Sequence, residues 1–327
     1  MRAGAAQTND PTRIHTTQYC HITPKHYATL DDALLGIARR RQSIRHTAEE
    51  IRRCGGVYRD QDHPVEIISL SPEAPARPPL LLIGGMGPLA GLTGFEMACR
   101  RFRGQRRILL FQACGTPCRT TAITAQHALL SKRTETQVII SIAHALIKGA
   151  TMIEEPMGEA ILLCNTAHYF LPAASNRFLA TPIAEEKHVT IHSLISAAAD
   201  ETQRLGHRRA LILATKGTYA AELYTEALYR RDITPVTPAQ QAQAWLEIAI
   251  RYGIKGQNIE LARQAGCACF HAFEEDLRKI DCIIAGCTEI PLLLKLVIAH
   301  TGYDRVAGFL RETDIVDPLA SLLKGLQ

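Results

Sequence analysis

The chain has 327 residues, of which 46% are hydrophobic, and it carries a formal charge of +5 at neutral pH. This length and composition predict a globular, soluble protein with enough apolar side chains for two domains. No apolar run approaches the ~18 residues that a membrane-spanning helix needs, and the arginine groups lack the interleaved aromatics of a nucleic-acid surface, so we expect neither a membrane nor a nucleic-acid partner.

Residues 1–76 differ in composition from the rest and are predicted to form an N-terminal extension. Residues 1–29 contain one acidic residue and no clear hydrophobic period, so we expect weak order there and a faint similarity to an export or transit address. A helix is predicted from Asp31 to Gly55, followed by a short strand over 65–70. The ten cysteines lack the spacing of a secreted disulfide framework, which favours a cytoplasmic protein.

From residue 79 onward, short apolar segments alternate with longer helical patterns. The clearest strand candidates are 80–83, 108–111, 160–163, 210–213 and 282–285. This alternation predicts an α/β fold with mostly parallel sheets covered by helices. We expect two similar three-layer α/β domains with a cleft between them. The first would comprise 77–178 together with 300–327, and the second 179–299.

Two cysteines lie where a predicted strand passes into a helix. Cys164 begins the sequence Cys-Asn-Thr-Ala-His, and Cys287 lies in Gly-Cys-Thr-Glu-Ile-Pro. Backbone amides and the helix dipole at such a turn lower the pKa of a thiol and can bind a carboxylate. Both turns follow the carboxyl ends of parallel strands, the edge where such folds bind ligands. We therefore expect the two thiols to face each other across the cleft.

Other patterns in the chain give weaker evidence of function. A single cysteine at the end of a strand is more often part of a core than of a site, and it is the matched pair of turns that favours catalysis. The turn Gly84–Pro88 would let backbone amides approach an anion, but its spacing fits neither a dinucleotide fingerprint nor a P-loop. Cys267-Ala-Cys269 lacks the spacing of a zinc site, so no metal is expected.

Together these motifs resemble the aspartate/glutamate racemase superfamily, the amino-acid racemases that work without pyridoxal phosphate, over roughly residues 79–327. The Gly-Gly-Met-Gly-Pro turn indicates the aspartate racemase branch, and Glu289 stands where glutamate racemases carry a histidine. Pro117-Cys-Arg-Thr looks like the family segment whose arginine binds substrate, which implies that role for Arg119. Ala214-Thr-Lys-Gly-Thr is similar to a second family segment, which implies that Lys216 is another carboxylate contact.

The resemblance implies an isomerase that needs no cofactor, racemises aspartate or glutamate, and forms a homodimer. Racemisation removes the α-proton from one face of the substrate and returns a proton to the other, so it needs two acid/base groups, here Cys164 and Cys287. The expected substrate-binding residues are Gly85, Met86, Arg119, Asn165, Thr166, Lys216 and Thr288. His168 and Glu289 are expected to contact these residues rather than the substrate. A related isomerase such as a maleate isomerase, or a catalytically silent binding or effector protein that keeps the pocket, stays open as an alternative.

Overall fold

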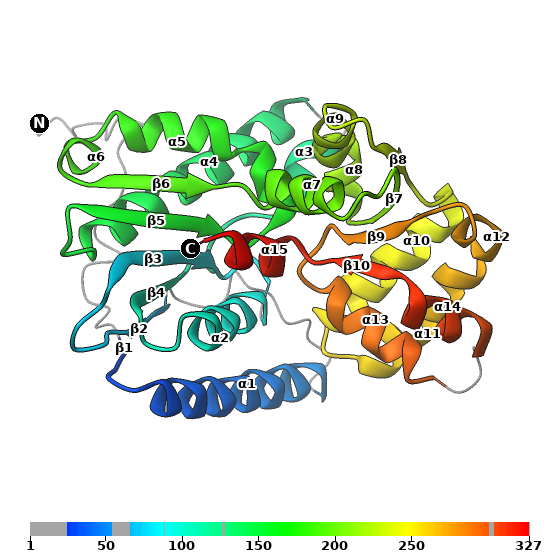
Figure 1. Cartoon of the computed structure of the whole chain (residues 1–327), viewed down its shortest axis with the longest axis horizontal. Helices are drawn as coiled ribbons and strands as arrows, with labels where there is room; N and C mark the ends of the chain where they lie inside the picture. The colour runs from blue at the N-terminus through cyan, green and yellow to red at the C-terminus, as the bar shows by residue number, and fades with distance from the viewer. Residues whose placement is uncertain (1–24, 54–65, 88, 126–127, 301–303, 327) are drawn as a thin grey trace, which may run out of the picture.

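The computed structural model describes residues 25–53, 66–87, 89–125, 128–300 and 304–326. They form two lobes, each built on one sheet (Figure 1). The six-stranded sheet has the order β1-β2-β4-β3-β5-β6 and the four-stranded sheet the order β10-β9-β7-β8. All neighbours are parallel except β2 and β4. The predicted α/β class with parallel sheets is therefore confirmed.

The strands of the first sheet are β1 Lys25–Tyr27, β2 Glu66–Leu70, β3 Arg77–Gly84, β4 Arg106–Gln112, β5 Met157–Leu162 and β6 His188–His192. Those of the second sheet are β7 Arg209–Leu213, β8 Thr234–Val236, β9 Cys282–Ala285 and β10 Asp314–Val316. Successive side chains of a strand point to opposite faces of its sheet. In β3, Leu80 and Leu82 accordingly belong to one core, and Leu81 and Ile83 to another. Burial on both faces explains why the strands are continuous apolar runs in the sequence.

Helices cover both faces of each sheet. The helices up to α7 are α1 Leu30–Arg53, α2 Ala90–Phe102, α3 Arg119–Thr124, α4 Ala128–Thr151, the 3₁₀ helix η3 Asn165–Tyr169, α5 Leu171–Leu179, α6 Pro182–Glu186 and α7 Leu194–Arg204. The later ones are α8 Lys216–Ala220, α9 Leu223–Tyr229, α10 Gln240–Ile248, the π-helix η4 Ala249–Ile254, α11 Ile259–His271, α12 Glu274–Leu277, α13 Ile290–Ile298, α14 Asp304–Glu312 and α15 Pro318–Gly325. Within the described ranges, no helix is both long and apolar enough to cross a bilayer.

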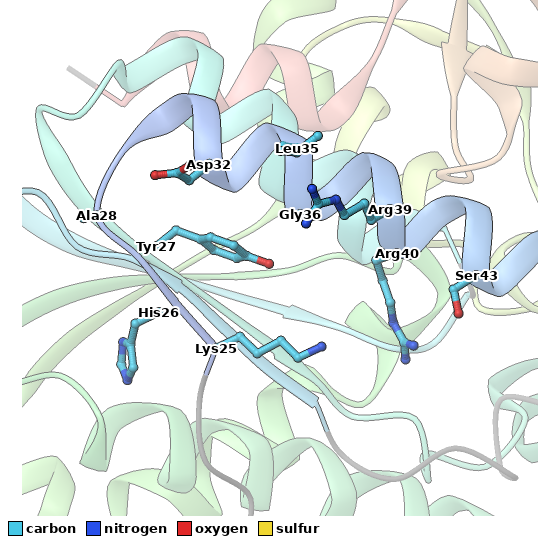
Figure 2. Close-up of a pocket in the computed structure, with 10 residues that line it drawn as sticks. All are labelled: Lys25, His26, Tyr27, Ala28, Asp32, Leu35, Gly36, Arg39, Arg40 and Ser43. Atoms are coloured by element: carbon cyan, nitrogen blue, oxygen red, sulfur yellow. The ribbon is translucent and has the colours of Figure 1, made fainter.

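The N-terminal extension is part of the first lobe, because β1 and β2 continue its sheet beyond β4. Ile68 and Leu70 of β2 are buried. Helix α1 lies beside α2 (Figure 1), and apolar side chains of both belong to the same core. An open pocket of about 570 Å³ lies between β1 and α1, where the ring of Tyr27 lies close to Gly36 (Figure 2). The weak order expected for residues 1–29 falls mostly on residues outside the described part.

The boundaries between the two lobes differ from the predicted domain boundaries at residues 178 and 300. β6 pairs with β5 in the first sheet, whereas β10 pairs with β9 in the second. After β10, helix α15 packs its leucines in the core of the first lobe. Both strands are short, and a short strand carries too few side chains to indicate which sheet it joins.

Replacing Leu70 by alanine should lower the free energy of unfolding by about 2–5 kcal/mol, because the side chain is 1% exposed and leaves a cavity. The matched control is Leu35→Ala on α1, whose side chain is 50% exposed, with an expected change within about 0.5 kcal/mol. Urea unfolding of both variants measures the difference. Equal stability of the two variants would mean that β2 contributes nothing to the core.

Candidate active site

The two predicted cysteines lie at corresponding places in the two lobes. Cys164 follows β5 and caps η3, and Cys287 follows β9 two residues before the cap of α13. Each is therefore at the carboxyl end of a parallel strand. Cys287 is 7% exposed, Cys164 is half-buried, and both are thiols rather than halves of a disulfide.

Lys255, the residue that follows η4, interacts electrostatically with both cysteines. Burial alone would lower the pKa of its ammonium group, but the negative charge of Glu289 raises it, with contributions in the same direction from Cys287 and Cys164 and an opposing one from the charge of Arg119. Interactions of this kind fade over roughly 10 Å in salt solution. Lys255 thus interacts electrostatically with a cysteine from each lobe.

Glu289 lies between Cys287 and Lys255. The Cys287 thiol donates a hydrogen bond to Glu289 Oε2 at 2.9 Å, and the Thr288 hydroxyl donates to the same oxygen at 3.0 Å. Lys255 Nζ lies 3.7 Å from the other carboxylate oxygen. Burial would raise the pKa of Glu289, but Lys255 and these hydrogen bonds lower it. Burial and the negative charge of Glu289 both raise the pKa of Cys287, so this cysteine is held as a protonated thiol.

The glycine-rich turn of the first lobe closes over this pair. A Cβ at Gly87 would lie 2.6 Å from Glu289 Oε1 and 3.7 Å from Lys255 Cε, so a side chain at this position would displace the Glu289 carboxylate. Gly85 has a φ of 84°, a left-handed conformation that favours glycine. The predicted turn is thus a point of contact between the lobes, and the buried Met86 lies within it.

Arg119 is 9% exposed and begins α3. Its guanidinium donates to the carbonyl oxygen of Met86 and, at 3.1 Å, to that of Pro117. These bonds fix a cation beside the glycine-rich turn. Burial would raise the pKa of the neighbouring Cys118 thiol, but hydrogen bonds with Thr121 and the charges of Arg119 and Arg251 lower it. Arg119 and Arg251 therefore place positive charge near the start of α3.

The residues after Cys164 are bound to the second lobe. The Thr166 hydroxyl lies 2.9 Å from the hydroxyls of both Thr215 and Thr218. The buried Tyr224 donates a hydrogen bond of 2.6 Å to Asn165 Oδ1. The structure thus brings Asn165 and Thr166 to the junction of the lobes, as a substrate-binding role requires.

Lys216 is the predicted residue whose side chain is most exposed. It is the first residue of α8, and its backbone N–H donates to Glu247 at 3.3 Å. Its contact with a substrate stays a prediction. Lys255, by contrast, was not predicted, because a lysine between glycines at 253 and 256 has no distinctive pattern in the sequence.

His168 holds the Cys164 turn in place rather than transferring protons. Its Nε2 accepts a hydrogen bond from the backbone N–H of Leu194 at 3.1 Å, so the ring proton is on Nδ1, which donates to the Cys164 carbonyl at 2.9 Å. Burial lowers the pKa of this imidazole to about 4. The neutral ring therefore ties the turn to the start of α7. Among the residues that the structure describes, no group of histidine, cysteine and carboxylate side chains could hold a metal ion.

Comparison with known proteins identifies the family. Residues 83–319 match the family model described as Asp/Glu/Hydantoin racemase. The chain belongs to this family. The predicted superfamily is confirmed, and the match begins in β3, so it leaves out β1, α1 and β2.

Solved structures of this racemase family have the same fold. The aspartate racemase of Picrophilus torridus is 20% identical, covers 76% of this chain and 94% of its own, and gives a TM-score of 0.54. An aspartate racemase homologue from Pyrococcus horikoshii OT3 is 19% identical, with 76% and 97% covered and a TM-score of 0.50. At these identities the likeness establishes two α/β lobes and leaves the substrate to be determined.

The variant Glu289→Gln should lower the pKa of the Cys287 thiol, because it removes a neighbouring negative charge while Lys255 stays. The pH dependence of iodoacetamide alkylation, followed at each cysteine by mass spectrometry, measures this change. Cys282 is the internal control, since burial raises the pKa of its thiol to about 12 and Glu289 has no part in it. An unchanged profile at Cys287 would mean that the carboxylate does not control this thiol.

Stability should fall in acid because of His168. Between its ordinary pKa of 6.5 and the folded value of about 4, the unfolded chain binds a proton that the folded chain does not. Stability is therefore lost as the pH falls through this window, by about 2 kcal/mol between about pH 7 and about pH 4.5. The variant His168→Gln lacks this titrating group. Measured by urea unfolding, its free energy of unfolding should therefore change less between the two pH values, by about 2 kcal/mol. The same difference in both proteins would refute a buried neutral imidazole.

Proposed function

We propose that this chain is a cofactor-independent racemase of an acidic amino acid, aspartate or glutamate, in which Cys164 and Cys287 serve opposite faces of the α-carbon. The observation that carries the proposal is that Tyr224 lies against both cysteine turns: its hydroxyl donates to Asn165, the residue after Cys164, and a Cβ at Gly286, the residue before Cys287, would lie 3.1 Å from its ring. Membership of the Asp/Glu/Hydantoin racemase family supports the class of reaction.

The reaction needs one thiolate and one thiol at the same time. In one direction the Cys164 thiolate takes the α-proton, so a C–H bond breaks and an S–H bond forms. The Cys287 thiol gives its proton to the opposite face, so its S–H bond breaks and a new C–H bond forms. The electron pair of the broken C–H bond is held on the α-carbon and its carboxylate in between. The product leaves Cys164 protonated and Cys287 ionised, which is the form needed for the reverse direction.

The hydrogen bond from Cys287 to Glu289 supports Cys287 as the protonated partner in the resting protein. In the described part of the chain, Cys164 makes no hydrogen bond to a carboxylate, and it is the N-cap residue of η3. In the proposed mechanism Cys287 therefore begins as the thiol and Cys164 as the thiolate.

The charges around the cleft suit a substrate with two carboxylates. Arg119 and Lys255 provide cations from the two lobes, and Glu289 offsets part of this charge beside Cys287. We assign the α-carboxylate to Asn165, Thr166 and the backbone at Thr288, because donors there stabilise the charge that develops when the α-proton leaves. The side-chain carboxylate would then bind Arg119, whose planar guanidinium suits bidentate pairing, with Lys216 at the rim.

We also propose a cytoplasmic homodimer. Catalysis by two thiols needs both cysteines reduced, which a reducing compartment maintains. Size-exclusion chromatography with light scattering measures the mass against the 36.0 kDa of one chain.

Purified protein without added cofactor should interconvert the enantiomers of aspartate or glutamate and incorporate solvent deuterium at the α-carbon. Cys164→Ser and Cys287→Ser should each lower racemisation by about 10²–10⁴-fold, because each removes one of the two acid/base groups. Chiral chromatography and proton NMR in deuterated water measure the two processes. Cys267→Ala on α11 is the control and should keep parental activity.

The outcomes separate the alternatives. Racemisation at the parental rate in both serine variants would refute the two-thiol mechanism. Maleate isomerisation without α-exchange of an amino acid would indicate the related isomerase. Binding of aspartate without exchange or isomerisation would indicate a silent binding protein.

A further inference from the structure

The second lobe makes a specific hydrogen bond to the amide of Asn165. Tyr224 lies on α9, packs in the core beneath the second sheet, and is 1% exposed. Its hydroxyl crosses to the first lobe and donates to Asn165 Oδ1 at 2.6 Å. Asn165 itself is 3% exposed and follows Cys164 directly. The contact thus joins a core residue of one lobe to a site residue of the other.

The Tyr224 hydroxyl is protonated and can donate a hydrogen bond. Burial, together with the negative charges of Cys287 and Asp317, raises the pKa of Tyr224 well above its ordinary value. The phenol is therefore protonated at neutral pH. A protonated phenol that donates to Oδ1 requires the carbonyl end of the Asn165 amide to point toward α9.

An asparagine amide can turn over and exchange its oxygen with its nitrogen at little cost unless its partners distinguish them. Here the phenol donates to Oδ1. In the opposite orientation it could accept from Nδ2, but its own buried proton would then lose the acceptor that the described residues give it. Among these residues no protein acceptor is bonded to Asn165 Nδ2. The NH₂ group is thus left to donate to a ligand. In the opposite orientation, the amide oxygen would take its place and would repel a carboxylate.

We propose that Tyr224 is a positioning residue, which fixes the amide of Asn165 so that its NH₂ group meets the α-carboxylate of the substrate. This inference rests on the proposed function, in which Asn165 binds that carboxylate. Because Tyr224 and Asn165 come from different lobes, the amide is oriented only when the lobes are together. The hydroxyls of Thr215 and Thr218, which bind the adjacent Thr166, support the same junction.

The variant Tyr224→Phe removes only the hydroxyl and should lower kcat/KM for racemisation about tenfold, the effect of losing a hydrogen bond that orients a substrate contact. Tyr219→Phe is the matched control. Tyr219 is a neighbouring tyrosine whose hydroxyl bonds to the backbone of Ala214 and Ile212 within its own lobe. This variant should keep kcat/KM within about twofold, since its hydroxyl does not reach the first lobe.

The Asn165→Ala background separates positioning from a general structural effect. If Tyr224 acts through Asn165, adding Tyr224→Phe to Asn165→Ala should cause no further loss of kcat/KM. An equal tenfold loss in both backgrounds would overturn the inference, as would a Tyr224→Phe enzyme no less active than Tyr219→Phe.

A second measurement does not depend on activity. In ¹H–¹⁵N NMR spectra, the side-chain NH₂ resonances of Asn165 should move in Tyr224→Phe and stay in place in Tyr219→Phe. If the wild-type protein neither exchanged nor racemised an amino acid, the proposed function would fail while a moved resonance would still show that Tyr224 orients the amide. Unmoved resonances in an active Tyr224→Phe protein would overturn the inference and leave the proposed function intact.

Discussion

A buried carboxylate needs a counter-charge, and this requirement organises the site. Glu289 is 6% exposed; Lys255 provides the counter-charge, and the Cys287 thiol and the Thr288 hydroxyl donate hydrogen bonds to it. Removing Lys255 would leave an uncompensated buried charge, which is strongly destabilising. The pair also lies against Gly87 of the other lobe, so the same interaction that sets the protonation of Cys287 depends on the two lobes meeting.

The two thiols are supported differently. Cys287 donates to a carboxylate, whereas the turn of Cys164 is held by the neutral ring of His168 and by the second-lobe partners of Asn165 and Thr166. Two cysteines at corresponding strand ends thus lie in different environments. In the proposed racemisation, this difference in environment separates the acid from the base.

Much of the fold followed from local patterns. All five expected strand candidates overlap strands of the structure, because strands buried on both faces are continuous apolar runs. β1, β6, β8 and β10 were not predicted, since strands of three to five residues carry little pattern. The N-terminal helix and strand were predicted as elements. Their place in the first lobe was not, because it depends on the antiparallel pairing of β2 with β4.

The sequence by itself determined the α/β class, the two cysteine turns and the glycine-rich turn, because each depends on neighbouring residues and on the strand that precedes it. Only the tertiary structure decided that Lys255 forms an ion pair with Glu289 and that Tyr224 donates a hydrogen bond to Asn165. These partners are 34 and 59 residues apart, and a single lysine or tyrosine has no local signal for such a contact. Their roles arise from packing between lobes, where burial makes each polar group depend on a partner from elsewhere in the chain.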